Sequence, residues 1–189
     1  MHVLRPFLLF LSRLGITPNL LTLCSLITIL FSGFFLALGL DILGGVVLLF
    51  GALLDAIDGE LVRVLHQESP IGGFFDSLSD HCGDFAVCLG LLCHFLVQLS
   101  PGGIVLTFMA LFGSMLGSQA RSRAAMLGIN TKDVGIFTRF ERMLILVVGL
   151  LSGEVIPALW ILAVFNNFSA IQRIIHIIRI PFSSEKLAR

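Results

Sequence analysis

Four aspartates lie close together in a chain that is otherwise largely apolar. They occur in the stretch DAIDGELVRVLHQESPIGGFFDSLSD as two pairs, with Asp55 and Asp58 three residues apart and Asp76 and Asp80 four residues apart. Residues at these spacings share one face of a helix, so each of two helices would present one pair of carboxylates. Carboxylate oxygens are the ligands that hard divalent cations prefer. The spacing therefore predicts a metal site shared between two helices.

Four negative charges inside an apolar bundle are costly unless they are neutralised. Arg63 is the one arginine close in sequence, and a single cation does not balance four anions. Two divalent ions would balance them, and a two-metal site can hold the attacking and leaving oxygens of a phosphoryl displacement. We therefore predict two Mg²⁺ or Mn²⁺ ions, with the four aspartates as ligands. The alternative is that these aspartates pair with arginines or line an aqueous vestibule.

The elements that must position these residues are long apolar helices. The 189-residue sequence is 57% hydrophobic and 13% charged, with a mean hydropathy of +1.02. Apolar runs of about 20 residues, enough for a helix to cross a hydrocarbon core of about 30 Å, recur along its whole length. This pattern excludes an ordinary soluble domain and a signal peptide on a soluble body. We predict an all-α membrane protein with six transmembrane helices, near residues 18–40, 44–66, 72–99, 103–127, 137–153 and 156–180.

The segment before the first predicted span, HVLRPFLLFLSRLG, is short and apolar on one side, and it carries Arg5 and Arg13. We expect it to form an amphipathic helix in the membrane interface, at about residues 2–14. The alternative is a frayed end. The prediction is a single domain over residues 1–189, with a six-helix bundle at about 18–180 and a short cytoplasmic C-terminal tail.

The basic residues set the expected orientation. With six spans, all 12 Lys and Arg residues fall on the side of the two termini, whereas the opposite turns carry Asp41 and Glu154 and no basic residue. Since cytoplasmic loops are rich in Lys and Arg, we expect both termini and the active site on the cytoplasmic side of the cell membrane. The sequence has no basic soluble face for nucleic acid. The short connection at HQESPIGG also predicts that the helices near 44–66 and 72–99 are antiparallel neighbours.

The aspartate region resembles the signature of the CDP-alcohol phosphatidyltransferases, D-x2-D-G-x2-A-R-x8-G-x3-D-x3-D. Seven positions match at every spacing: Asp55, Asp58, Gly59, Arg63, Gly72, Asp76 and Asp80. The one departure is Val62, which stands where the family has alanine. The stretch ITPNLLTL at residues 16–23 is similar to the family's usual entry into its first transmembrane helix.

The resemblance implies a metal-dependent phosphotransferase of phospholipid biosynthesis, working as a homodimer. In this reaction an acceptor hydroxyl attacks the lipid-bearing phosphate of a CDP-linked lipid, such as CDP-diacylglycerol, and CMP leaves. Glycine permits close approach of a bulky group, and arginine binds phosphate. The residues implied to bind the CDP group are Asp58, Gly59, Arg63 and Gly72.

The same resemblance implies a role for each aspartate. The first three would hold one metal ion, and Asp55, Asp76 and Asp80 would hold the second. Asp80 would also act as the general base toward the acceptor hydroxyl. Asp84 continues this face four residues further on but has no place in the signature. We expect Asp84 to form hydrogen bonds behind the ligands rather than to bind metal.

A second, basic cluster, GSQARSRAAMLGINTKDVGIFTRFERM, spans residues 117–143. Arg121, Arg139 and, further along, Arg173 occur in a pattern that resembles the family members that use inositol phosphate. Arginines suit a phosphorylated acceptor because they bind phosphate through paired hydrogen bonds. We therefore expect these three residues to bind the acceptor phosphate. For Arg123 and Arg142, anchoring at the cytoplasmic surface is an equal alternative.

The match to that branch is partial. Gln119 replaces a tyrosine, Ala125 and Thr138 replace two glutamates, and His81 follows Asp80 where the branch usually has arginine. We predict transfer to a phosphorylated polyol, with inositol phosphate favoured. The alternatives are glycerol 3-phosphate or an unphosphorylated alcohol such as serine as acceptor and, more distantly, a cation transporter.

Overall fold

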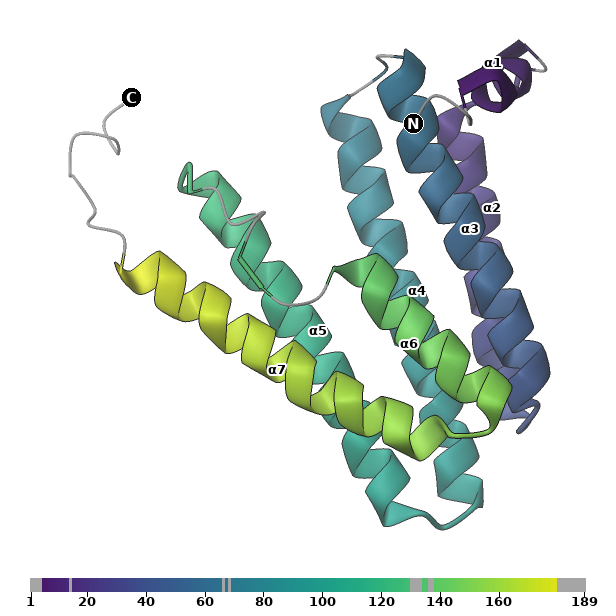
Figure 1. The fold of residues 1–189 in the computed structure, drawn as a ribbon, viewed down its shortest axis with the longest axis vertical. Helices are drawn as coiled ribbons and strands as arrows, with labels where there is room; N and C mark the ends of the chain where they lie inside the picture. The colour runs from purple at the N-terminus through teal and green to yellow at the C-terminus, as the bar shows by residue number, and fades with distance from the viewer. Residues whose placement is uncertain are drawn as a thin grey trace.

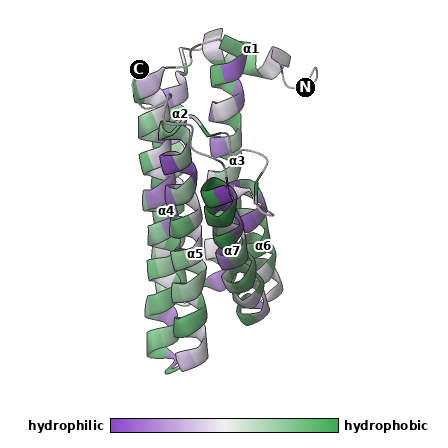
Figure 2. Ribbon diagram, turned by 90° about the vertical axis from the view of Figure 1, so that its left-hand side faces the viewer, coloured by the Kyte–Doolittle hydropathy of each residue, from purple (hydrophilic) through white to green (hydrophobic). Residues whose placement is uncertain are grey.

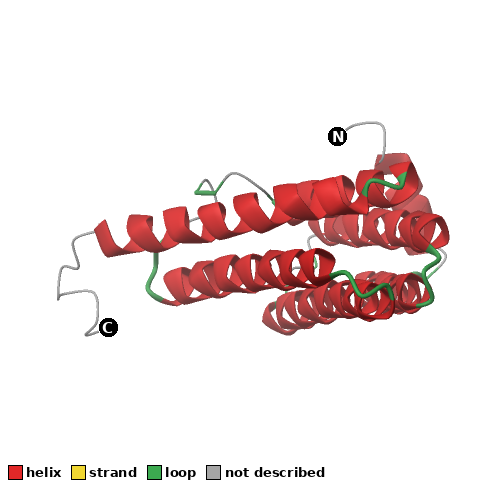
Figure 3. Ribbon diagram, turned by 90° about the horizontal axis from the view of Figure 1, so that it is seen from below, coloured by secondary structure: helices red, strands yellow, loops and turns green. Residues whose placement is uncertain are grey.

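The computed structural model describes residues 5–13, 15–65, 67, 69–129, 134–135 and 138–179. Within these ranges the chain is helical, without a strand (Figure 3). Its helices are α1 (Arg5–Arg13), α2 (Pro18–Ala37), α3 (Asp41–Leu65), α4 (Pro70–Val97), α5 (Pro101–Met126), α6 (Arg139–Ser152) and α7 (Val155–Arg179). The predicted all-α class is confirmed, and the ends of α2 to α7 differ from the predicted ends by at most three residues.

Helix starts are set by side chains that cap the first turn. Four helices begin directly after a serine or threonine whose hydroxyl accepts a hydrogen bond from the backbone N–H three residues on, and three of these helices begin with proline. Such caps satisfy backbone donors that a helix start leaves without a partner. At α6, Thr138 and Glu141 form a reciprocal capping box. This box makes Arg139 the first residue of α6.

Five helices, α2, α3, α4, α5 and α7, are long and apolar enough to cross a membrane. Large apolar side chains such as Phe31, Phe50 and Trp160 are exposed on the outside of the bundle. Apolar residues are found along all the long helices (Figure 2). Such a surface suits lipid rather than water. The chain is therefore a multi-pass integral membrane protein. α6 has 14 residues, or about 21 Å at 1.5 Å per residue, so a sixth span stays a prediction.

The N-terminal segment forms a helix at the predicted place. α1 lies across the end of the bundle near the start of α2 (Figure 1), and Leu8 is buried in a small apolar cluster with Leu21 and Leu61. Its location in a membrane interface stays a prediction. Residues 2–4 and 14 of the predicted helix, residue 180 of the last predicted span and the predicted tail after it lie outside the described residues.

The six longer helices form a closed ring in which each packs against two others. The order around the ring is α2, α4, α5, α7, α6, α3 and back to α2. In the described part of the chain no Cα atom of α3 lies within 8 Å of one in α4. The prediction that these two helices are direct neighbours is therefore wrong, because α2 packs against both of them. The gap leaves room for the aspartate side chains of α3 and α4.

Small residues let α2 approach its neighbours closely. Ser25 and Ser32 of α2 donate hydrogen bonds to the carbonyl oxygens of Gly51 and Gly44 of α3, at 2.9 and 2.8 Å. On the other side, a Cβ atom at Gly90 of α4 would collide with the carbonyl oxygen of Gly33. Because backbone atoms cannot move aside as a flexible side chain can, the crossing of α2 and α4 requires glycine at this point.

We expect Gly90→Ala to lower the free energy of unfolding by about 1–3 kcal/mol, because the added methyl group overpacks this crossing. Thermal unfolding in detergent measures the change. Gly102→Ala is the matched control, since a Cβ atom there meets nothing within 4 Å. Equal melting temperatures for the two variants would contradict the close crossing.

Candidate active site

α3 and α4 direct three carboxylates to one point inside the ring. Asp55, Asp76 and Asp80 each offer one oxygen, and these oxygens all lie within 4.8 Å of one another. The fourth predicted ligand, Asp58, is not part of this trio. It lies one turn further along α3 and is buried, with 3% of its surface exposed. Its Oδ2 atom has no hydrogen-bond partner among the described residues.

This donor set fits a hard divalent cation. Three anionic oxygens at such short separations repel one another unless a cation lies between them, and a buried carboxylate oxygen without a partner is itself unfavourable. Oxygen donors in this number are typical of Mg²⁺ and Mn²⁺ sites. The carboxylates of α3 and α4 therefore have the composition and spacing of a divalent metal site.

A cavity of about 500 Å³ opens beside the aspartates, between the start of α2, the end of α3 and the start of α4. All four residues predicted to bind the CDP group line it: Asp58, Gly59, Arg63 and Gly72. Asp76 also lines the cavity, so the cavity reaches the carboxylate trio. A Cβ atom at Gly59 would meet nothing within 4 Å, which leaves the backbone there open to a ligand.

Sequence reasoning missed several polar residues of this cavity. Thr17, Asn19, Gln67 and Ser69 line it as well. Thr17 and Ser69 are the capping residues of α2 and α4, which was the signal available in the sequence. Their side chains add neutral hydrogen-bonding groups to a cavity whose charged groups come from α3 and α4.

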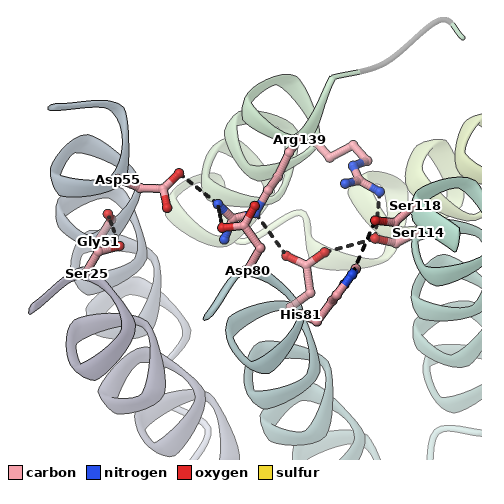
Figure 4. Close-up of polar contacts among 10 residues, drawn as sticks. Ser25, Gly51, Asp55, Asp80, His81, Ser114, Ser118 and Arg139 are labelled. Carbon is pink, nitrogen blue, oxygen red and sulfur yellow. Dashed lines mark hydrogen bonds and ion pairs between the residues drawn. The ribbon is translucent and has the colours of Figure 1, made fainter. Parts of the chain in front are cut away.

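Arg139 lies among the carboxylates rather than apart from them (Figure 4). Its Nη1 atom is 2.7 Å from Oδ2 of Asp55 and 2.6 Å from Oδ1 of Asp80. Its Nε atom is 3.7 Å from Oδ1 of Asp84. Asp55 and Asp80 therefore do pair with an arginine, which was the alternative to a metal site. This contact could not be predicted from local sequence patterns, because Arg139 is 84 residues from Asp55.

A chain of hydrogen bonds extends from this point toward α5. Ser114 donates to Oδ2 of Asp84 at 2.9 Å, and Arg142 donates to Ser114 at 2.6 Å. Asp84 is therefore hydrogen-bonded behind the trio, as expected. His81 contacts Ser118 of α5 through Nε2, at 3.3 Å (Figure 4). These contacts connect α4, α5 and α6 on the side of the trio away from the large cavity.

The three arginines predicted to bind the acceptor phosphate have different surroundings. Arg173 of α7 is buried and donates to the carbonyl oxygens of Val134 and Gly117, at 2.8 and 3.1 Å. Arg121 is exposed on α5, where its charge repels those of Arg142 and Arg173. No carboxylate of the described residues forms an ion pair with Arg121 or Arg173. The charges of Arg121, Arg142 and Arg173 therefore form one positive region. Arg139 lies among the aspartates instead, and its charge repels that of Arg142.

Comparison with known proteins identifies the class. A model of the CDP-alcohol phosphatidyltransferase family matches residues 15–182. An archaetidylinositol phosphate synthase of Pyrococcus horikoshii is 35% identical over 164 residues, covering 87% of this chain and 85% of the relative. A phosphatidylinositol phosphate synthase of Mycolicibacterium smegmatis is 31% identical over 178 residues, covering 88% of this chain and 79% of the relative. This chain therefore belongs to the CDP-alcohol phosphatidyltransferase family and is a transferase.

Within that family the chain resembles the phosphatidylinositol phosphate synthase branch. Its fold is similar to that of Mycobacterium tuberculosis phosphatidylinositol phosphate synthase (PgsA1) with CDP-DAG bound, with a TM-score of 0.83 and 24% identity, covering 100% of this chain and 98% of that one. The structure of the same enzyme in complex with manganese and citrate gives a TM-score of 0.84 at 24% identity, covering 99% of this chain and 93% of that one. At this identity the likeness establishes the fold.

The cavity predicts how Gly59→Leu should behave. The open space at Gly59 should accept the larger side chain without loss of stability, but the side chain would take up room in the cavity. We expect affinity for a CDP-linked lipid to fall by about tenfold or more, equivalent to about 1.4 kcal/mol.

Binding of CDP-diacylglycerol to purified protein and thermal unfolding would be measured together. Gly102→Leu is the control, because that position is also open and does not line the cavity. Unchanged affinity in Gly59→Leu would mean that the CDP group binds elsewhere.

Proposed function

We propose that this enzyme transfers the lipid-bearing phosphate of a CDP-linked lipid to an inositol phosphate and releases CMP. The observation that carries the proposal is the position of the carboxylate trio, between a cavity of about 500 Å³ and a region rich in arginine. Relatives named archaetidylinositol phosphate synthase and phosphatidylinositol phosphate synthase support this choice of acceptor. CDP-DAG in the structure of a protein with the same fold supports the choice of donor.

In the proposed reaction the CDP group occupies the cavity. The open backbone at Gly59 allows close approach of the nucleotide, Gly72 lies in the first turn of α4, and Arg63 supplies a positive charge for the diphosphate. Arg63 also pairs with Glu60, one turn away. This pair lies on an exposed part of α3, so it costs little to break when a phosphate competes for the arginine.

Two divalent ions, Mg²⁺ or Mn²⁺, would be held by Asp55, Asp58, Asp76 and Asp80 and would neutralise charge on the diphosphate. Asp80 accepts the proton of the acceptor hydroxyl. The hydroxyl oxygen then bonds to the lipid-bearing phosphorus, and the bond from that phosphorus to the oxygen bridging to CMP breaks. Asp80 suits this task because it is the trio member next to Asp84 on α4, on the side where the arginines lie.

The phosphate of the acceptor would bind the positive region. Arg121 contributes an exposed guanidinium, and Arg173 has hydrogen-bond donors left after its two backbone contacts, since a guanidinium has five. Arg139 would complete the site. Mutual repulsion among Arg121, Arg142 and Arg173 favours binding of an anion between them. An uncharged acceptor such as free inositol would leave that repulsion uncompensated.

The proposal includes the arrangement in the membrane. α6, which packs between α3 and α7, would be the sixth span. α1 would lie in the interface with its apolar side toward lipid. The side that carries all the Lys and Arg residues would be cytoplasmic, with both termini and the active site on that side. The protein would be a single domain and would work as a homodimer.

An acceptor screen tests the function. Purified protein is supplied with labelled CDP-diacylglycerol and Mg²⁺ or Mn²⁺, and CMP release is measured with inositol phosphate, glycerol 3-phosphate, inositol or serine. We expect release with inositol phosphate to exceed that with unphosphorylated inositol by about a hundredfold or more, as loss of a phosphate held by charged hydrogen bonds would require. Preferred use of glycerol 3-phosphate or serine would replace the proposed acceptor with one of the alternatives.

Asp80→Asn tests the general base. The amide keeps the shape of the side chain but cannot accept the proton, so we expect turnover to fall by about 10²-fold or more while CDP-lipid binding is retained. Asp84→Asn is the matched control one turn further along α4, where we expect a smaller loss. Near-normal CMP release from Asp80→Asn would show that another group accepts the proton.

A further inference from the structure

One nitrogen of Arg139 contacts two of the three carboxylates in the trio. Nη1 lies within 2.7 Å of both Oδ2 of Asp55 and Oδ1 of Asp80. The arginine side chain is 17% exposed and the two aspartates 26% and 27%. Both ion pairs are therefore partly shielded from water. Charge interactions in such a shielded site are stronger than at an open surface. Arg139 thus interacts directly with the group of oxygens that suits a divalent ion.

A guanidinium and a divalent cation compete for such oxygens. Two cations at contact distance from the same carboxylates repel each other, and salt screens this repulsion poorly over a few ångströms. When the metal ion binds, the guanidinium must therefore give up at least one of its two contacts. Arg139 has a long and flexible side chain, so the change needs only new side-chain torsions, while the capping box keeps the start of α6 in place.

The surroundings limit where the guanidinium can go. On the side of the trio away from the cavity, its Nε atom lies 3.7 Å from Oδ1 of Asp84. Its charge also repels that of Arg142, which belongs to the positive region with Arg121 and Arg173. Another positive charge is unfavourable there unless an anion is present. A phosphate in that region would reverse the effect, because it would attract Arg139 away from the aspartates.

We propose that Arg139 couples the two sites: it yields the carboxylates of Asp55 and Asp80 to the divalent ion and then binds the phosphate of the acceptor. Metal and acceptor phosphate consequently strengthen each other's binding, as linkage requires when both displace the same ion pair. The metal half of this inference stands without any substrate, and the phosphate half rests on the proposed function.

The first experiment measures Mn²⁺ affinity of the purified full-length protein in detergent, without substrate, by electron paramagnetic resonance of free Mn²⁺. Because the variant removes the competing cation, we expect Arg139→Gln to bind Mn²⁺ about tenfold more tightly than the wild type. Arg142→Gln is the matched control, since Arg142 lies on the same helix but donates to Ser114. Its affinity should change by less than that of Arg139→Gln.

Unchanged or weaker Mn²⁺ binding by Arg139→Gln would overturn the proposal. An equal gain in Arg142→Gln would also overturn it, because that would indicate a general charge effect.

Arg139→Lys provides a second variant that keeps a cation at this position. A lysine has a single charged nitrogen and fewer donors than arginine, so we expect an affinity between those of the wild type and Arg139→Gln. Affinity tighter than that of Arg139→Gln would count against competition, because a cation at this position would then have strengthened metal binding.

The second experiment uses the wild type and measures Mn²⁺ affinity with and without inositol phosphate or inorganic phosphate. We expect either anion to tighten Mn²⁺ binding several-fold, and this gain to shrink in Arg139→Gln. An equal gain in the variant would mean that the anion binds the metal directly, and it would overturn the coupling role. Failure of the proposed acceptor in the activity screen would leave the metal titration unaffected, so the two ideas fail separately.

Discussion

The structure depends on holding three carboxylates together inside a membrane-embedded ring of helices. Asp55, Asp76 and Asp80 come from two helices that do not pack against each other, yet their oxygens lie within 4.8 Å. The negative charges of these carboxylates repel one another. This repulsion must be balanced by backbone packing elsewhere and by a cation at the centre. α2 supplies the packing, because its glycine and serine contacts fix α3 on one side and α4 on the other. α6 supplies the cation Arg139.

Much of this arrangement could be predicted from local sequence signals. Pro18, Pro70 and Pro101 and the caps before them mark helix starts, so the predicted ends were close to those observed. The spacing of the aspartates gave the faces of α3 and α4, and the positions that line the cavity followed from the resemblance. These features depend on residues a few positions apart, where helix geometry decides the outcome.

Features that depend on packing between distant segments could not be predicted. A short connection between α3 and α4 favoured direct contact, but α2 packs against both helices. It crosses α4 closely at Gly33 and Gly90, and it is hydrogen-bonded to α3 through two serines. The contact of Arg139 with Asp55 requires the ring to close between α3 and α6. Arg173 likewise matched a motif, yet the structure uses part of its guanidinium to join α7 to two backbone carbonyls. A motif specifies a residue type, whereas tertiary packing decides which of its donors remain available.

The position of the trio within the ring also constrains the sides from which the two substrates would approach. The large cavity is lined by residues of α2, α3 and α4 and of the segments that join them, whereas the arginines come from α5, α6 and α7. In the proposed reaction, donor and acceptor would therefore approach the carboxylates from opposite sides. This arrangement suits an in-line displacement, in which the attacking oxygen and the leaving group lie on opposite sides of phosphorus. Asp80 lies on the arginine side, within 2.6 Å of Arg139. Arg139 contacts Asp55 as well, so a hydroxyl whose phosphate lies among the arginines would arrive beside both carboxylates. Of these two, Asp80 is the one on α4, one turn from Asp84, and it is the residue proposed above to accept the proton.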